Sequence, residues 1–302
     1  MAEVTLLDGG MGQELVHRAG DRPTPLWSTT VMMEHPGLVG QVHDDYFAAG
    51  AMVATTNTYA IHRDRLVKAG IEDQFAALHG LALDAAATSR AAAGRGRPGL
   101  RIAGSIGPLV ASYRPETHPP HDVAVALYAE VAGVLAPRVD LILCETVASV
   151  AHARAVLQGA RRAGVPVWLS VTVDDRDGAR LRSGEPVAEA AAVAVAEGAG
   201  AVLANCSAPE AMARALDGLA GVGLPFGAYA NGFTMITADF LKDSPTVDAL
   251  QARRDLGPAA YAGFALGWVA QGATIVGGCC EVGPAHIAAL HRALLAAGHQ
   301  VV

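Results

Sequence analysis

Two cysteines stand side by side near the end of the chain, in the stretch IVGGCCEVGP that covers residues 275–284. The 302-residue sequence holds only two other cysteines, Cys144 and Cys206. Neighbouring cysteines make a poor disulfide, because joining them strains the peptide between them, so Cys279 and Cys280 point to metal binding or catalysis. Together with Cys206 they would fill three corners of a zinc tetrahedron and leave the fourth open, as in a catalytic zinc site.

A zinc ion with three thiolate ligands has a specific chemical use. Soft thiolates select zinc over magnesium or calcium, and the open position can bind a substrate thiol and keep it as the nucleophilic thiolate near neutral pH. The cysteines therefore predict the alkylation of a substrate sulfur. The alternative is that free cysteines are small buried hydrophobic side chains. We favour that alternative for Cys144, which lies inside the apolar run LILCET.

Eight short apolar runs recur along the chain, and most are followed by a turn and then by a segment with helical periodicity. They cover residues 4–10, 51–59, 100–108, 139–146, 165–173, 200–207, 224–232 and 273–280. Apolar strands that alternate with helices indicate a parallel sheet covered by helices. Eight such units predict a single (β/α)8 TIM barrel that forms one domain over residues 1–302. The alternative, a doubly wound open sheet, lacks its usual G-x-G-x-x-G turn after the first strand.

Polar residues gather at the carboxyl ends of most of these runs. In a barrel, all of those ends share one rim, which is where active sites are built. The fold would thus bring residues far apart in the sequence beside one another. The residues concerned are Asp8, Thr55, Thr56, Asn57, Ser105, Glu145, Asn205, Cys206, Asn231, Cys279 and Cys280.

Composition and charge narrow the class of function. The formal net charge is −7 and no cluster of lysine and arginine occurs, so nucleic acid and anionic membranes are not expected partners. No uninterrupted apolar run approaches the length of about 20 residues that a membrane span needs. The N-terminal MAEVTLLDGG reaches an acidic residue and a glycine pair too early for a signal peptide. We expect a cytoplasmic protein, a monomer or small homo-oligomer, that acts on small molecules.

With these motifs the sequence resembles the homocysteine S-methyltransferase family almost end to end. The matching segments are LLDGGMGQEL, PLWS, HDDYFAAGAMVATTNTY, GSIGP, ETV, NCS and GGCC. The combination of NC and GGCC with the DGG opening is specific to that family. The resemblance implies a (β/α)8 barrel and a zinc ion (Zn²⁺) held by Cys206, Cys279 and Cys280. It also implies transfer of a methyl group to the sulfur of L-homocysteine, which gives methionine.

The resemblance also implies how the amino-acid part of the acceptor is held. Glu145 matches the family carboxylate that pairs with the α-ammonium group of homocysteine. Asp8, with the backbone N–H groups of Gly9 and Gly10, would open a helix whose N-terminus receives the α-carboxylate. An alternative role for Asp8 is to cap the helix that begins near Met11.

Three further residues have expected places in the site, and two segments depart from the family pattern. Thr56 and Asn57 would line the acceptor pocket, and Asn231 matches a family asparagine near the metal. Around it, residues 228–236 read AYANGFTMI where the family usually has a proline before the asparagine and a short polar stretch after it. Residues 58–66 read TYAIHRDRL where a glutamine-containing segment is common. Both departures concern the binding of a donor or an acceptor tail.

The identity of the methyl donor is the remaining question. Family members use S-methylmethionine, S-adenosylmethionine, betaine or a methylated corrinoid–folate system. Only about twenty residues follow GGCC, and stand-alone members of this size generally use a sulfonium, which is the donor expected here. One alternative keeps the thiol-activating site with a corrinoid protein as donor or another thiol as acceptor. Another is a non-catalytic protein that binds zinc or homocysteine.

Overall fold

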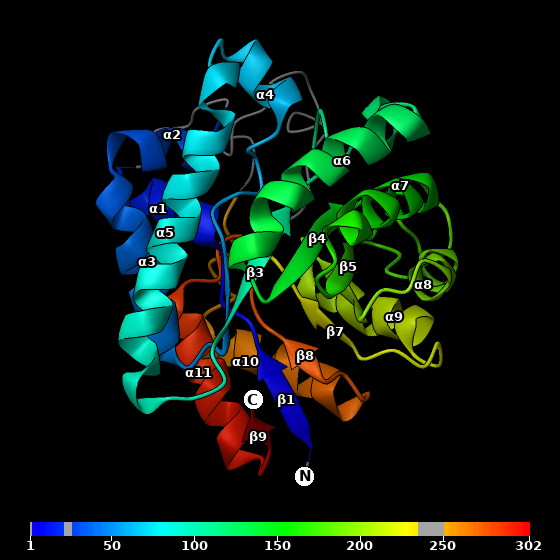
Figure 1. Ribbon diagram of the computed structural model, residues 1–302. Coiled ribbons are helices and arrows are strands. Elements are labelled where there is room, and N and C mark those ends of the chain that lie inside the picture. The colour runs from blue at the N-terminus through cyan, green and yellow to red at the C-terminus, as the bar shows by residue number, and fades with distance from the viewer. Residues whose placement is uncertain (1, 21–25, 235–250) are drawn as a thin grey trace.

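The protein is built on a curled parallel sheet of nine strands in the computed structural model, which describes residues 2–20, 26–234 and 251–302 (Figure 1). The strand order is β2-β3-β4-β5-β6-β7-β8-β1-β9. The strands are β1 (Glu3–Leu6), β2 (Val53–Thr55), β3 (Arg101–Ile106), β4 (Leu141–Val147), β5 (Val167–Val171), β6 (Ala201–Asn205), β7 (Phe226–Tyr229), β8 (Ile275–Val276) and β9 (Gln300–Val301).

Helices cover the outer face of this sheet (Figure 1). Several begin with proline, whose missing N–H has no intrahelical partner to lose at that position. Within the described residues, none is long and apolar enough to cross a bilayer. The α-helices are α1 (Met11–Arg18), α2 (Ser28–Glu34), α3 (Pro36–Ala49), α4 (Arg63–Lys68), α5 (Phe75–Ala93), α6 (His121–Leu135), α7 (Val150–Ala160), α8 (Val187–Ala196), α9 (Pro209–Leu219), α10 (Pro258–Ala270) and α11 (Pro284–Ala296).

Each of the eight predicted apolar runs overlaps one strand, which confirms an α/β fold with a parallel sheet. The strands are shorter than the runs, because the runs extend into the turns that follow. The ninth strand, β9, was not predicted. It consists of Gln300 and Val301, which pair with Glu3 and Val4 of β1. Two residues are too few to show a strand period.

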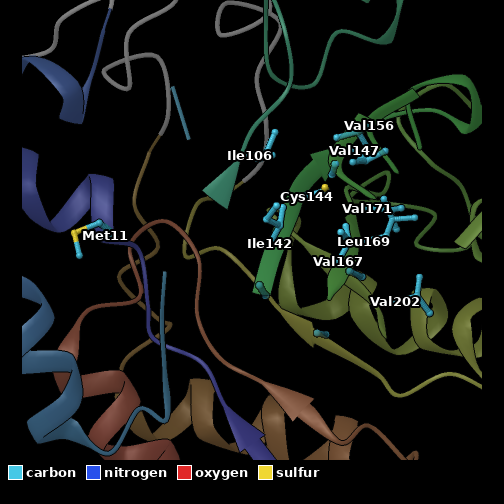
Figure 2. Packing of buried hydrophobic residues seen from close by; sticks show 14 of the residues in the cluster. Met11, Ile106, Ile142, Cys144, Val147, Val156, Val167, Leu169, Val171 and Val202 are labelled. Carbon is cyan, nitrogen blue, oxygen red and sulfur yellow. The ribbon is translucent and has the colours of Figure 1, made fainter. Parts of the chain in front are cut away.

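Alternation along β4 explains why two neighbouring residues have different surroundings. Successive side chains of a strand point to opposite faces. Leu141 and Leu143 belong to the cluster inside the curled sheet, whereas Ile142 and Cys144 pack in the larger cluster between sheet and helices (Figure 2). Cys144 is therefore a fully buried core residue, as predicted. Glu145 follows on the inner face, where the candidate site lies.

Candidate functional site

A cavity of about 570 Å³ lies at the carboxyl ends of the strands. Its lining includes residues from the ends of seven strands, as the polar pattern of the sequence indicated. They are Asp8 after β1, Thr55 in β2, Ser105 in β3, Glu145 in β4, Cys206 after β6, Tyr229 in β7, and Cys279 with Cys280 after β8.

The three predicted metal ligands converge in this cavity. The sulfur atoms of Cys206, Cys279 and Cys280 all lie within 4.8 Å of one another, and those of Cys206 and Cys279 are 2.6 Å apart. In a tetrahedral zinc site with Zn–S bonds of about 2.3 Å, the sulfurs would be roughly 3.8 Å apart, so one ion can reach all three. Hydrogen bonds from the other two thiols hold the pKa of Cys206 well below its usual value. The donor set and its convergence fit a thiophilic cation.

Cys206 is placed by a strained turn at the end of β6. It has a φ of +48° and Thr146, at the end of β4, has a φ of +60°. For residues other than glycine such angles are uncommon and persist only where the surroundings impose them. Asn205 supplies part of that restraint. Its side-chain oxygen accepts from the Thr146 N–H (3.0 Å) and from the Ser170 hydroxyl (2.9 Å), and its amide donates to the Thr146 hydroxyl (3.1 Å).

The Cys279–Cys280 segment is held by backbone hydrogen bonds to the neighbouring strand ends. The N–H of Cys279 donates to the carbonyl of Ala230 (2.9 Å), and the carbonyl of Cys280 accepts from Gly232 (2.8 Å). Gly277, just before the pair, is not in the left-handed region. A Cβ there would instead lie 2.5 Å from the Cβ of Leu7. This glycine is therefore required by close packing against Leu7, the residue that follows β1.

Gly10 makes a similar close approach, and its replacement by alanine should displace the segment that carries two of the three candidate metal ligands. An added Cβ would lie 2.6 Å from the carbonyl oxygen of Cys279 and 3.0 Å from the Cα of Cys280. Because these are backbone atoms, the segment that carries both thiols must shift. We expect Gly10→Ala to weaken zinc binding by roughly 10- to 100-fold, measured by competition with a chromophoric chelator. Gly37→Ala is the control, since a Cβ there meets nothing within 4 Å. Equal zinc affinity in both variants would contradict this expectation.

Two carboxylic acids lie deep in the cavity. Glu145 is 9% exposed, and its carboxylate accepts hydrogen bonds from the hydroxyls of Ser105 (2.5 Å) and Tyr229 (3.0 Å). Asp8 is 2% exposed and accepts from the N–H (2.7 Å) and hydroxyl (2.8 Å) of Thr55. Burial raises the pKa of Asp8 to about 8 and that of Glu145 to about 7. A cationic ligand beside either carboxyl would therefore stabilise its ionised form.

The alternative role of Asp8 as a helix cap is wrong. Helix α1 begins at Met11 with Gly10 as its N-cap, and no side chain caps it. The carboxylate of Asp8 turns instead to Thr55 on β2. The N–H of Gly10 donates to the carbonyl of Val282 (3.1 Å), so it is already bonded within the protein. Gly9 and Gly10 do line the cavity, as expected.

Of the three remaining predicted residues, two line the cavity and one does not. Thr56 and Asn57 line the cavity, but their side chains are engaged within the protein. The hydroxyl of Thr56 shares a hydrogen bond with Thr58 (2.7 Å), and the amide oxygen of Asn57 accepts from Ser28 (2.7 Å). Asn231 is buried at the end of β7 and is not among the residues that line the cavity. Its side-chain oxygen accepts from the N–H of Phe233 (3.2 Å).

Several cavity residues were not singled out as site residues from the sequence. Tyr229 could have been found, since it lies next to the end of β7 at the common rim. Trp27, Tyr59 and Tyr113 also line the cavity. They come from turns, where no periodic pattern shows which way a side chain points. Trp27 and Tyr59 lie edge to face, with ring centroids 6.2 Å apart.

Comparison with known proteins gives a consistent result. The family model described as homocysteine S-methyltransferase matches residues 5–294. Homocysteine S-methyltransferase of Escherichia coli K12 is 32% identical over 95% of this chain and 94% of its own length. Homocysteine S-methyltransferase 4 of Zea mays is 28% identical over 96% and 89%. The crystal structure of the E. coli homocysteine methyltransferase MmuM in its metallated form has a TM-score of 0.80 and 30% identity, and the match covers 96% of each chain.

Proposed function

The chain belongs to the homocysteine S-methyltransferase family, and from this premise we propose that it transfers a methyl group from a sulfonium donor to the sulfur of L-homocysteine, giving methionine. The observation that carries the proposal is the convergence of Cys206, Cys279 and Cys280 in a cavity that also holds buried carboxylic acids. The three sulfurs can hold a metal ion that binds the thiol of homocysteine, and the carboxylic acids can bind its α-ammonium group.

We propose zinc as the metal, held by the sulfurs of Cys206, Cys279 and Cys280. Three thiolates prefer zinc to hard cations and leave a fourth position for a substrate thiol. When bound, zinc supplies the means to keep that thiol deprotonated near neutral pH. The turns around Cys206 and Cys279 fix the sulfurs on the cavity wall, where Cys206 is buried and Cys279 and Cys280 are partly exposed, so a substrate thiol in the cavity can reach them.

The carboxylates of Glu145 and Asp8 are proposed to bind the α-ammonium group of homocysteine. Both are buried on the cavity wall, and an ammonium group beside them would restore their ionised form. The hydroxyls of Ser105 and Tyr229 hold the Glu145 carboxylate in one orientation. Thr56, Asn57, Gly9 and Gly10 are proposed to shape the acceptor pocket. Asn231 remains a prediction as a residue near the metal.

A sulfonium donor suits the aromatic part of the cavity, where Trp27, Tyr59 and Tyr113 line the wall. Aromatic faces attract cations, most strongly where water is excluded. In the transfer, the bond from the donor sulfur to the methyl carbon breaks and its electron pair stays on that sulfur. The acceptor thiolate forms the new bond, and the donor leaves as a neutral thioether that needs no proton. The proton of the acceptor thiol has passed to solvent beforehand. The cavity contributes to the reaction by aligning the donor sulfur, its methyl group and the acceptor sulfur.

We also propose that the sheet closes into a single (β/α)8 barrel within one domain. Support comes from the contact between β1 and β2. Leu7 forms a parallel bridge with Val53, the N–H of Met52 donates to the carbonyl of Leu6 (2.8 Å), and that of Asp8 donates to Val53 (3.0 Å). Closure would bring every strand end to one rim, which is the arrangement that the proposed site requires.

The direct test is methionine formation from homocysteine and S-methylmethionine labelled in its methyl groups. The zinc-loaded protein is assayed under reducing conditions, and the product is followed by mass spectrometry. We expect labelled methionine to form at an enzymatic rate and to depend on zinc. Zinc-loaded protein that yields none with S-methylmethionine or S-adenosylmethionine would overturn the sulfonium assignment.

A further inference from the structure

Charge is segregated along the cavity. Of the described residues that line it, the acidic ones are Asp8 and Glu145, both buried near the sulfurs. The basic ones are Arg65, Lys68 and Arg114. Arg65 and Lys68 belong to α4, which stands beyond the carboxyl ends of the strands (Figure 1). The inner cavity therefore suits a cationic group and the outer cavity an anionic one.

The ion pairs of the described residues leave out two of these basic side chains. Neither Arg65 nor Lys68 forms an ion pair within the described part of the chain. Arg63 on the same helix differs, because it contacts Glu130 (2.7 Å) outside the cavity. The guanidinium of Arg65 donates one hydrogen bond, to the carbonyl of Pro108 (2.8 Å). Its Nε is buried without a hydrogen-bond partner.

A partly buried guanidinium with an unused donor is a site for a planar anion. Arginine presents its N–H groups in a fork that matches a carboxylate, and leaving such a donor unpaired is costly. The ring of Tyr59 lies 6.0 Å from the guanidinium carbon of Arg65. Its hydroxyl pairs with Ser112 (2.8 Å). Tyr59 therefore lies beside Arg65 and lines the same cavity as the three cysteines.

We propose that Arg65, assisted by Lys68, binds the carboxylate of the methyl donor and so restricts the donor to sulfonium carboxylates. The inference rests on the proposed function and adds its specificity residue. A carboxylate at Arg65 would lay the rest of the donor along Tyr59, with its sulfonium toward the acceptor sulfur. No described acid lines the outer cavity to pair with a donor ammonium group. A sulfonium carboxylate without an amino group, such as dimethylsulfoniopropionate, should therefore bind as well as S-methylmethionine does.

The experiment compares S-methylmethionine with its methyl ester, which keeps the sulfonium and the amino group but lacks the carboxylate. Binding to the zinc-loaded protein is measured by calorimetry, with L-homoserine in excess to occupy the acceptor position. We expect the wild type to bind the acid roughly 10- to 100-fold more tightly than the ester. In Arg65→Met this ratio should fall to about 1, because the discriminating charge is gone. Lys68→Met should lower it partially.

Two further variants separate recognition from structure. Arg63→Met removes the same charge from the same helix but outside the cavity, so the acid-to-ester ratio should stay at the wild-type value. Arg65→Lys keeps the charge and should retain part of the ratio, which a merely structural role for the Pro108 contact would not predict. If Arg65→Met does not fold, the acid-to-ester ratios of Arg65→Lys and Lys68→Met test the proposal instead. A wild type without acid preference, or a preference kept in Arg65→Met, overturns the proposal.

Failure of the inference differs from failure of the proposed function. Methionine produced by wild type and Arg65→Met with the same acid-to-ester preference would keep the function and reject the role of Arg65. Conversely, the ratio could collapse in Arg65→Met while the wild type makes no methionine. That result would establish the carboxylate site and reject methyl transfer to homocysteine.

Discussion

Replacing Cys279 with serine should remove bound zinc and reduce methyl transfer by about a thousandfold or more. Serine presents a hard, neutral hydroxyl where the cavity presents a soft thiolate, so two sulfurs would have to hold the ion alone. Without the ion, none of the described residues of the cavity wall would keep the acceptor thiol deprotonated near neutral pH. The measurements are zinc per chain after desalting, by elemental mass spectrometry, and the rate of labelled methionine formation.

The matched control is Cys144→Ala, which removes a cysteine from the core side of β4. Cys144 is fully buried between sheet and helices and does not line the cavity. Its loss should cost about 1 kcal/mol of stability and leave the zinc content at the wild-type value. Retention of zinc and activity in Cys279→Ser would show that the three cysteines are not the metal site. Equal loss of zinc in Cys279→Ser and Cys144→Ala would show that general unfolding, and not the loss of a ligand, releases the ion.

The position of the site could be predicted because strand ends are visible in the sequence. Apolar runs that end in Asp8, Glu145, Cys206 or Cys279 share one edge once they are parallel. No local conformation needs to be known for that conclusion. The same reasoning separated Cys144 from Cys206, since one lies inside its run and the other at its end.

What the sequence could not show depends on contacts between distant segments. The left-handed turn at Cys206 is imposed by Asn205 bonding across to Thr146, and β-type patterns do not reveal it. The carboxylate of Asp8 turns to Thr55, 47 residues away, because β1 and β2 lie side by side there. Arg65 reaches the cavity from a short helix whose placement depends on packing. In each case the deciding partner is remote in the chain.

Glu145→Gln should raise the KM for homocysteine by roughly 100-fold and also stabilise the protein at alkaline pH. The first effect follows from loss of the charge that pairs with the α-ammonium group. The second follows from burial, which raises the pKa of Glu145 from 4.5 to about 7. Below pH 4.5 this carboxyl is protonated in both the folded and the unfolded chain, so the stability associated with its neutral form is fully present. As the pH rises from 4.5 through 7, the unfolded chain ionises first and that stability is lost. Above pH 7 the folded chain holds a buried, ionised carboxylate.

Glutamine has no such dependence on pH, so the stability difference between variant and wild type should grow by about 2 kcal/mol from pH 5 to pH 8. Urea unfolding of protein freed of zinc and substrate measures it, with reductant present. The control is Glu130→Gln, which loses a half-exposed ion pair with Arg63 and should change stability by less than about 1 kcal/mol and leave the KM for homocysteine unaltered. An unchanged KM in Glu145→Gln would show that this carboxylate does not bind the α-ammonium group of homocysteine. A variant less stable than wild type at pH 8 would show that the hydroxyls of Ser105 and Tyr229 stabilise the ionised group more than burial destabilises it.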